Sequence, residues 1–305
     1  MMTPLPVIID CDPGTDDAIA LLLALASPEI ALQAITVVGG NVGLERTLAN
    51  ALALVGLAGA LVPVHAGAGR PLRGEFTSAP RAHGENGLAG VTLPPGGAPA
   101  PGVAADVIRA HLRAATTPLT LVGIGPATNL ALALMAEPDL AANIGQIVLM
   151  AGAFAGGNVT DTAEFNAWSD PEALSVLLAA GRPLTLAPLD LTHQALVTPA
   201  RLARLRAAGS GEVLRIACDI LAALPPHPTL AGRPLHDPCA VAWAIRPDLF
   251  TARPARVSVS RAEGATRGET RIAPATTATA NAMVLETLDA ARFFALLGER
   301  IASLP

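Results

Sequence analysis

Short apolar runs alternate along the chain with stretches in which apolar residues recur at helical spacing. The pattern predicts strands at residues 5–9, 30–38, 62–65, 119–122, 146–150 and 184–188, and helices at 18–25, 44–57, 103–115, 127–136 and 171–180. Short strands return over 255–286, before a final helix at 289–301. Because strands that alternate with helices are typical of βαβ units, this order predicts a doubly wound α/β fold.

Two long segments interrupt the alternation. Residues 67–102 and 225–234 are rich in Pro and Gly, and their lengths are typical of loops that cover a binding site. We find neither an internal repeat nor a linker, so we expect one domain that spans residues 1–305. In open α/β sheets ligands bind at the carboxyl ends of the parallel strands, so polar residues directly after strands are the candidates for a site.

Composition indicates the cellular compartment in which the protein is expected. The chain has 305 residues, of which 51% are hydrophobic, but no apolar run approaches the about 18 residues that a membrane helix needs. The first residues lack the basic and apolar regions of an export signal. Three cysteines without a CxxC pair favour neither a disulfide framework nor a zinc ribbon. We therefore expect a soluble protein of the reducing cytoplasm, without a membrane partner.

The charged residues exclude several classes of function. The formal net charge is -5, and all 20 basic residues are Arg, because the chain contains no Lys. The arginines are scattered and form no basic stripe, so we do not expect nucleic acid as a partner. Schiff-base lysine chemistry, pyridoxal phosphate anchoring and a Walker-type P-loop each need a Lys, and all three are excluded.

The most informative segment follows the first predicted strand. Asp10, Asp12, Asp16 and Asp17 place four carboxylates within eight residues, on either side of a Pro-Gly turn. Because such carboxylates repel one another, we expect a hard divalent cation among them, Ca²⁺ or Mg²⁺ rather than Zn²⁺. The alternative is that Asp16 only caps the helix and Asp17 only favours its dipole, which leaves Asp10 and Asp12 without a role.

Two other metal or phosphate motifs fit this segment poorly. An EF-hand loop that began at Asp10 would need Gly at its sixth position and Glu at its twelfth, where this chain has Thr15 and Leu21. A phosphatase of the haloacid dehalogenase type also begins with Asp-x-Asp after a strand, but its phosphate site uses a Lys. This chain has no Lys to offer.

The aspartate segment, residues 10–18, closely resembles the signature of the inosine–uridine-preferring nucleoside hydrolases. Four further segments match that family in the same order: Gly40-Asn41-Val42, residues 83–88 (HGENGL), residues 158–166 from Asn158 to Glu164-Phe165-Asn166, and His236-Asp237-Pro238. The resemblance extends from residue 7 to at least 243. It implies an open α/β fold around one mixed, mostly parallel sheet that is flanked by helices.

The resemblance also implies an activity and a cofactor. Members of the family hydrolyse ribonucleosides to free base and ribose with inversion, and a Ca²⁺ lies at the bottom of the ribose pocket. The implied metal ligands are Asp12, Asp17, Asp237 and the backbone carbonyl of Ile124. Asp12 would also deprotonate the attacking water, and a cage of carboxylates would stabilise the ribosyl oxocarbenium-like transition state.

The family further implies which residues hold the ribose. Asp16, Asn41 and Asn166 would bind the 2′- and 3′-hydroxyls, with Asp237 on the 3′ side, whereas Asn158 and Glu164 would hold the 5′-hydroxyl and Met150 would pack on the sugar. Taken singly these residues have simpler interpretations, since Asn41 also suits a turn and Met150 also suits a core. Their joint occurrence favours the ribose pocket.

Histidines are the candidates at the leaving base. The resemblance implies that His236 donates a proton to the base, although a histidine that starts a helix is the simpler alternative. His83 would contact substrate or lie on the surface, and His227 could assist the leaving group. The chain has no Tyr, so the sequence gives no base preference. Family members form dimers or tetramers, which implies a homo-oligomer.

Two other functions remain open at this point. The same pocket would serve a Ca²⁺-dependent protein that binds ribose or nucleosides without catalysis. It would also serve a hydrolase of another ribosyl compound, which would differ only in the loops around the base.

Overall fold

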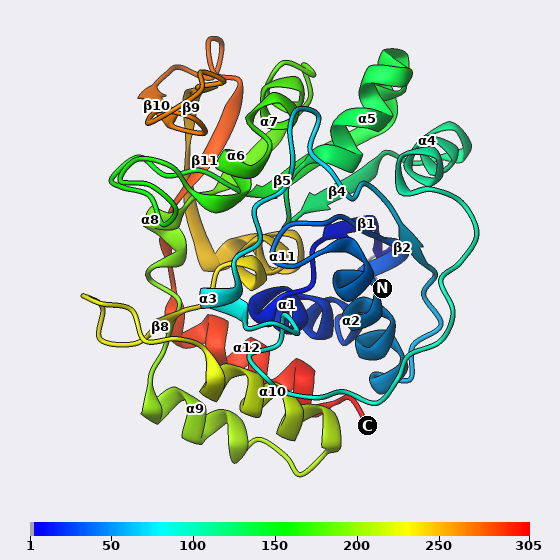
Figure 1. Ribbon diagram of the computed structural model, residues 1–305, viewed down its shortest axis with the longest axis vertical. Coiled ribbons are helices and arrows are strands. Elements are labelled where there is room, and N and C mark those ends of the chain that lie inside the picture. The colour runs from blue at the N-terminus through cyan, green and yellow to red at the C-terminus, as the bar shows by residue number, and fades with distance from the viewer. Residues whose placement is uncertain (1–2) are drawn as a thin grey trace.

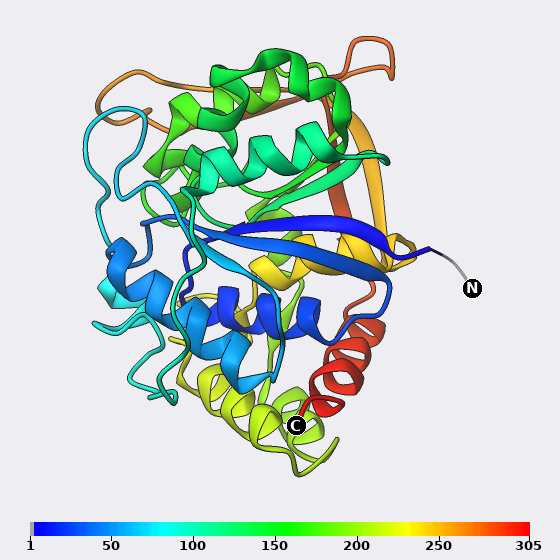
Figure 2. The same ribbon diagram turned by 90° about the vertical axis from the view of Figure 1, so that its right-hand side faces the viewer.

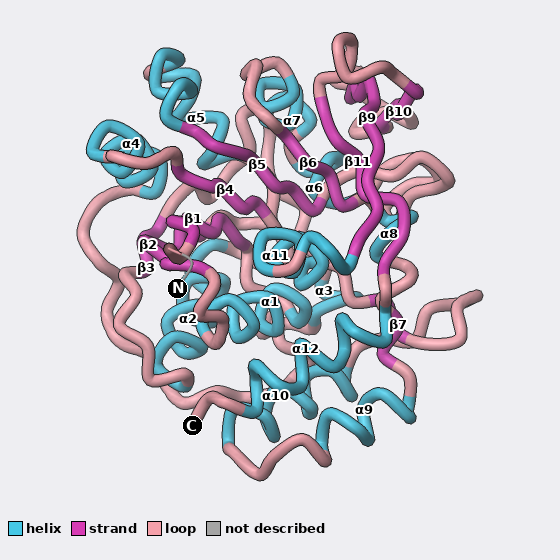
Figure 3. The backbone as a smooth tube through the Cα atoms, turned by 180° about the vertical axis from the view of Figure 1, so that it is seen from behind, coloured by secondary structure: helices cyan, strands magenta, loops and turns pink. Residues whose placement is uncertain are grey.

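The computed structural model describes residues 3–305, and a twisted nine-stranded sheet runs through its centre (Figures 1 and 3). The strand order is β10-β9-β11-β6-β5-β4-β1-β2-β3. The strands are β1 (Leu5–Cys11), β2 (Ile30–Val37), β3 (Val64–Ala66), β4 (Leu119–Gly123), β5 (Ile144–Met150), β6 (Leu184–Ala187), β9 (Phe250–Val259), β10 (Thr270–Pro274) and β11 (Ala282–Leu288). Neighbours from β3 to β11 are parallel, whereas β9 is antiparallel to β11 and β10. The expected mixed, mostly parallel sheet is confirmed.

Helices cover both faces of this sheet (Figure 2). One face carries α4 (Ala104–Ala114), α5 (Thr128–Ala136) and α7 (Pro171–Leu178), and the other carries α1 (Thr15–Leu25), α2 (Leu44–Leu57), α9 (Pro199–Arg206), α10 (Glu212–Ala223), α11 (Asp237–Ile245) and α12 (Ala290–Ala302). Because side chains alternate along a strand, Val7 and Ile9 of β1 are buried in one core and Ile8 is buried in the other.

Shorter elements connect these layers. They are the helices α3 (Pro80–His83), α6 (Phe165–Ser169) and α8 (Leu189–Thr192), the 3₁₀ turns Pro138–Asn143 and Pro247–Leu249, and a two-stranded sheet of β7 (Leu196–Val197) and β8 (Arg233–Pro234). Among residues 3–305, no helix combines the length and the apolar character that crossing a membrane requires.

The order of the strands determines where a ligand can bind. From β1 the chain proceeds outward through β2 and β3 on one side, and later through β4, β5 and β6 on the other. The loops after β1 and β4 therefore diverge, which opens a crevice at their carboxyl ends. Asp12 follows β1 directly and Ile124 follows β4 directly, so both lie at this switch point.

The predicted elements and the observed ones differ mainly at their ends. Strand β1 continues to Cys11, and α1 begins at Thr15 with Gly14 as its N-cap, so Asp16 and Asp17 lie within the first turn. The segment 67–102 contains the short helix α3, and the segment 225–234 ends in β8. The sequence pattern did not predict α9, α10 or α11.

Candidate active site

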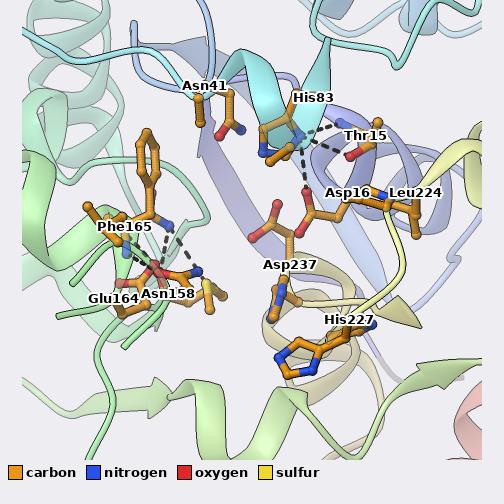
Figure 4. A pocket seen from close by; sticks show the side chains of 18 of the residues that line it. Thr15, Asp16, Asn41, His83, Asn158, Glu164, Phe165, Leu224, His227 and Asp237 are labelled. Carbon is orange, nitrogen blue, oxygen red and sulfur yellow. Dashed lines mark hydrogen bonds and ion pairs between the residues drawn. The ribbon is translucent and has the colours of Figure 1, made fainter. Parts of the chain in front are cut away.

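A pocket of about 250 Å³ opens at the switch point of the sheet (Figure 4). Its walls come from α1, the loop after β2, α3, the loops after β4 and β5, the segment before β8 and the start of α11. The lining residues are Thr15, Asp16, Asn41, Ala79, Ala82, His83, Ile124, Met150, Asn158, Val159, Glu164, Phe165, Asn166, Leu224, Pro225, Pro226, His227, Pro228, Pro234, His236 and Asp237. The polar side chains among these described residues are carboxylates, amides, a hydroxyl and imidazoles.

Asp12 lies beneath the floor of the pocket and is fully buried. Its Oδ2 accepts a hydrogen bond of 2.7 Å from the backbone N–H of Asn41, but its Oδ1 has no hydrogen-bond partner. Gly40 and Gly125 lie against the two oxygens, where a β-carbon would come within 2.1 Å of Oδ2 and 2.5 Å of Oδ1, respectively. The chain thus makes room for this carboxylate and leaves one of its oxygens free.

Three further carboxylates converge beside Asp12. Ligand atoms of Asp16, Asp17 and Asp237 all lie within 4.8 Å of one another, which is an arrangement that could hold a metal ion. Asp16 and Asp17 are on the first turn of α1 and Asp237 is on the first turn of α11, and these two helices pack together. Two distant parts of the sequence therefore build one acidic group.

Hydrogen bonds fix the orientation of Asp17. Its Oδ1 accepts from the backbone N–H of Asp12 at 3.1 Å, and its Oδ2 accepts from the N–H of Gly14 at 3.0 Å and from Asn41 Nδ2 at 2.9 Å. Asn41 also donates to the carbonyl oxygen of Asp12 at 3.1 Å. Asn41 is therefore a bridge between the end of β1 and the start of α1.

Burial makes these carboxylates hard to ionise in the protein alone. Desolvation, and next the charge of Asp16, raise the pKa of Asp17 to about 7. Desolvation also raises the pKa of Asp12 and of Asp237 well above the usual range, and repulsion from the neighbouring aspartates adds to it. A cation placed among them would remove both causes, since it replaces lost hydration and cancels the repulsion.

Asn166 connects the ends of β4 and β5 at the pocket. Its Nδ2 donates to the carbonyl oxygen of Ile124 at 2.9 Å and to that of Met150 at 3.0 Å. Asn166 lies on α6, whose N-cap is Glu164. Met150 is 3% exposed, and it both lines the pocket and belongs to the core. The interpretation as a core residue and the interpretation as a pocket residue are therefore compatible.

Glu164 is almost completely buried, although it lines the pocket. Its carboxylate accepts from the backbone N–H groups of Asn166, Gly152 and Ala167 at 2.8, 2.9 and 3.0 Å. Desolvation raises its pKa to about 7, against the opposing effect of these three donors. Asn158 accepts from the N–H of Phe165 at 2.9 Å, and this bond fixes the neighbouring loop.

Three histidines surround the open part of the pocket. His83 Nδ1 accepts from the N–H of Thr15 at 3.2 Å and lies 4.0 Å from Asp16. Its pKa is lowered by desolvation, which outweighs the charge of Asp16. His236 is the N-cap of α11, and its Nδ1 lies 2.7 Å from the hydroxyl of Thr192. Figure 4 shows His227 and His83 on opposite sides of Asp237.

Asp10 does not join the expected group of four carboxylates, because its Oδ1 accepts hydrogen bonds from Thr36 Oγ1 at 2.6 Å and from Asn129 Nδ2 at 2.8 Å. The structure brings together all the residues to which a role in the site was assigned. Ten of them line the pocket, namely Asp16, Asn41, His83, Ile124, Met150, Asn158, Glu164, Asn166, His236 and Asp237, whereas Asp12 and Asp17 lie beneath its floor. Thr15, Phe165, Thr192 and His193 were not singled out. Thr15 and Phe165 lie within the matched segments 10–18 and 158–166, which could have indicated them. Thr192 lies on the short helix α8 and His193 is its C-cap, and no sequence pattern indicated either.

The fold and the acidic pocket at its switch point agree with the class of protein that the sequence motifs indicate, and comparison with known proteins shows that class to be the nucleoside hydrolases. The profile of the family described as inosine-uridine preferring nucleoside hydrolase matches residues 7–295. A pyrimidine-specific ribonucleoside hydrolase RihA from Salmonella typhimurium is 42% identical over 306 residues, which cover 97% of this chain and 98% of the relative. The chain belongs to this family of nucleoside hydrolases.

Solved structures of other members have the same fold. A purine-preferring ribonucleoside hydrolase from Gardnerella vaginalis is 33% identical with a TM-score of 0.89, and the match covers 98% of each chain. An inosine-guanosine nucleoside hydrolase is 30% identical with a TM-score of 0.91, over 99% of this chain and 100% of the other. The chain is therefore similar to proteins whose names describe different base preferences.

Proposed function

We propose that this protein hydrolyses the N-glycosidic bond of ribonucleosides with inversion and requires Ca²⁺. The single observation that carries the proposal is the free Oδ1 of Asp12, a buried carboxylate oxygen without a hydrogen-bond partner beside a group of three more carboxylates. An unpaired anionic oxygen is costly in a protein interior unless a cation or a proton satisfies it. These residues fit a hard divalent cation because they offer only oxygen ligands.

The ligands would be Asp12, Asp17, Asp237 and the carbonyl oxygen of Ile124. Asn166 supports that carbonyl by its hydrogen bond of 2.9 Å, and Asn41 supports Asp12 and Asp17. When bound, Ca²⁺ supplies the positive charge that keeps these carboxylates ionised and polarises a water molecule. The choice of Ca²⁺ over Mg²⁺ follows from the number of oxygen ligands, since Mg²⁺ tends to retain several waters.

In this proposal Asp12 removes a proton from the water that attacks C1′ of the ribose. Its Oδ1 is available for the proton, because only Oδ2 is engaged by Asn41. The attack comes from the floor of the pocket and the base leaves toward the opening, so the configuration at C1′ is inverted. The acidic lining stabilises the positive charge that develops on the ribosyl ring.

The remaining polar residues would hold the ribose in place. Asp16, Asn41 and Asn166 would bind the 2′- and 3′-hydroxyls together with Asp237, while Asn158 and Glu164 would hold the 5′-hydroxyl. Met150 would pack on the sugar, and His83 would contact the substrate from the wall that α3 forms. A site built to pair these hydroxyls would reject 2′-deoxynucleosides, because its buried polar groups would stay unpaired.

His236 would donate a proton to the departing base. The hydroxyl of Thr192 can either donate to Nδ1 of His236 or accept from it, so the ring is supported whether or not it carries the extra proton. His236 lines the pocket beside Asp237, on the side from which the base leaves.

We further propose that pyrimidine ribonucleosides are the preferred substrates, as the name of the relative at 42% identity suggests. The test is release of ribose from uridine, cytidine, inosine and adenosine by the purified protein, with Ca²⁺ and with a chelator. The proposal expects release that depends on Ca²⁺ and is fastest with a pyrimidine. Binding of uridine without release of ribose would instead indicate a protein that binds nucleosides without catalysis.

A further inference from the structure

His227 lies on the segment that closes one side of the pocket, and its ring nitrogens are not equivalent. Its Nδ1 accepts hydrogen bonds from the backbone N–H groups of Thr229 and Leu230, both at 3.2 Å. A backbone amide can only donate, so an Nδ1 that accepts from two of them carries no proton. The neutral ring must therefore hold its proton on Nε2, and it presents an N–H donor.

The hydrogen bonds of His227 differ from those of His236. The Nδ1 of His236 lies 2.7 Å from the hydroxyl of Thr192, a group that can both donate and accept, so this contact does not decide which ring nitrogen carries the proton. A proton on Nδ1 of His227 would face two N–H donors and break both bonds. His227 is thus suited to donate a hydrogen bond and unsuited to act as the acid of the leaving group.

The position of His227 indicates which part of the substrate it meets. Pro225, Pro226 and Pro228 beside it are exposed, so this segment forms the mouth of the pocket, whereas Asp237 at the floor and Asp17 beneath it are buried. With the ribose over these carboxylates, the base points toward the mouth. In a pyrimidine nucleoside the substituent at C4 is across the ring from N1, so it is the atom farthest from the ribose.

We propose that His227 is a specificity-determining residue, which donates its Nε2–H to an acceptor at the far edge of the base, O4 in uridine. This inference rests on the proposed hydrolysis of ribonucleosides. Cytidine carries an amino group in place of O4, and its N–H groups would face the N–H of His227. Two donors that face each other leave both without a partner, so the site favours uridine over cytidine.

The test compares the ratio of kcat/KM for uridine to that for cytidine in the wild type and in His227→Leu. Uracil and cytosine differ as leaving groups, but this difference is the same in the wild type and in the variant. The change in the ratio therefore reports the contribution of residue 227 alone. We expect the ratio to be about tenfold lower in His227→Leu, which corresponds to about 1.4 kcal/mol. Thr229→Ala is the matched control, since it removes the Thr229 hydroxyl, which lies 3.4 Å from Nδ1, but keeps both backbone donors, and its ratio should equal that of the wild type.

A second measurement tests the tautomer without relying on activity. A long-range ¹H–¹⁵N spectrum of the histidine rings, with His227 assigned by its absence from His227→Leu, should show the proton of His227 on Nε2. A proton on Nδ1, or a ratio that His227→Leu leaves unchanged, would overturn the inference. Failure of the proposed function is a different outcome, because the wild type would then release ribose from neither substrate.

Discussion

Replacing Asp17 with Asn tests whether the acidic group binds a cation, because it changes one ligand atom and almost no volume. Asp17 accepts three hydrogen bonds, from the N–H groups of Asp12 and Gly14 and from Asn41 Nδ2. The amide of Asn can keep two of these by turning its oxygen toward Gly14 and Asn41. The third donor, the N–H of Asp12, then loses its partner, at a cost of about 1–3 kcal/mol.

In the metal-free protein this cost is offset. Desolvation and the charge of Asp16 raise the pKa of Asp17 to about 7, so a neutral side chain at this position removes an unfavourable buried charge. We therefore expect the metal-free forms of the wild type and of Asp17→Asn to unfold within a few degrees of each other.

With Ca²⁺ the two proteins should differ. At a free Ca²⁺ concentration of 100 times Kd, binding stabilises the wild type by about 2.7 kcal/mol, which is about 5 °C in Tm for a chain of this size. If Asp17→Asn weakens binding about 100-fold, the same concentration gives about 0.4 kcal/mol, less than about 1 °C.

The assay is thermal unfolding of both proteins, with Ca²⁺ and with a chelator. Asp219→Asn is the matched control, because Asp219 is a carboxylate of the exposed ion pairs on α10, and its response to Ca²⁺ should equal that of the wild type. A shift in Asp17→Asn as large as in the wild type would refute the role of this carboxylate.

Three further changes test other parts of the account. Asp12→Asn should lower kcat by a factor of about 10³ or more, because it removes the proposed base, and single-turnover kinetics that match the wild type would rule this out. His236→Ala should slow uridine hydrolysis more than hydrolysis of 4-nitrophenyl riboside, whose leaving group needs no acid, and equal losses would argue against His236 as the acid. Burial, and next the charges of His236 and His227, lower the pKa of His193 to about 4, so its contribution to stability is complete above about 6.5 and is lost as the pH falls toward 4. His193→Asn should therefore lose less stability than the wild type over that range in urea titrations, and identical pH profiles would contradict this assignment.

The central parallel strands β4 and β6 could be predicted because they are buried on both faces and are almost entirely apolar. Helix α11 was missed for a related reason. After Asp237 its residues are almost all apolar, since it packs against both α1 and the sheet, and a helix that is buried on every side has no amphipathic pattern. Its first residue nevertheless could be placed in the site, because the motif around His236 and Asp237 resembles that of the family.

The candidate site was predictable where short motifs carry it and unpredictable where contacts between distant segments decide its chemistry. The aspartates from Asp12 to Asp17 are close in sequence, so the turn and the helix start bring them together, whereas the partners of Asp10, Thr36 and Asn129, come from distant segments. Thr192 contacts His236 across 44 residues of sequence, and its hydroxyl can support the ring as a donor or as an acceptor. A threonine at the end of a four-residue helix gives no sign of such a role in the sequence.

The central claim is that buried carboxylates around one Ca²⁺ allow this pocket to cleave ribonucleosides. The most direct measurement is the rate of ribose release from uridine by protein freed of metal, before and after Ca²⁺ is restored. The account predicts no release without the cation and full release once it is returned. Equal rates in both states, or no release in either, would contradict it.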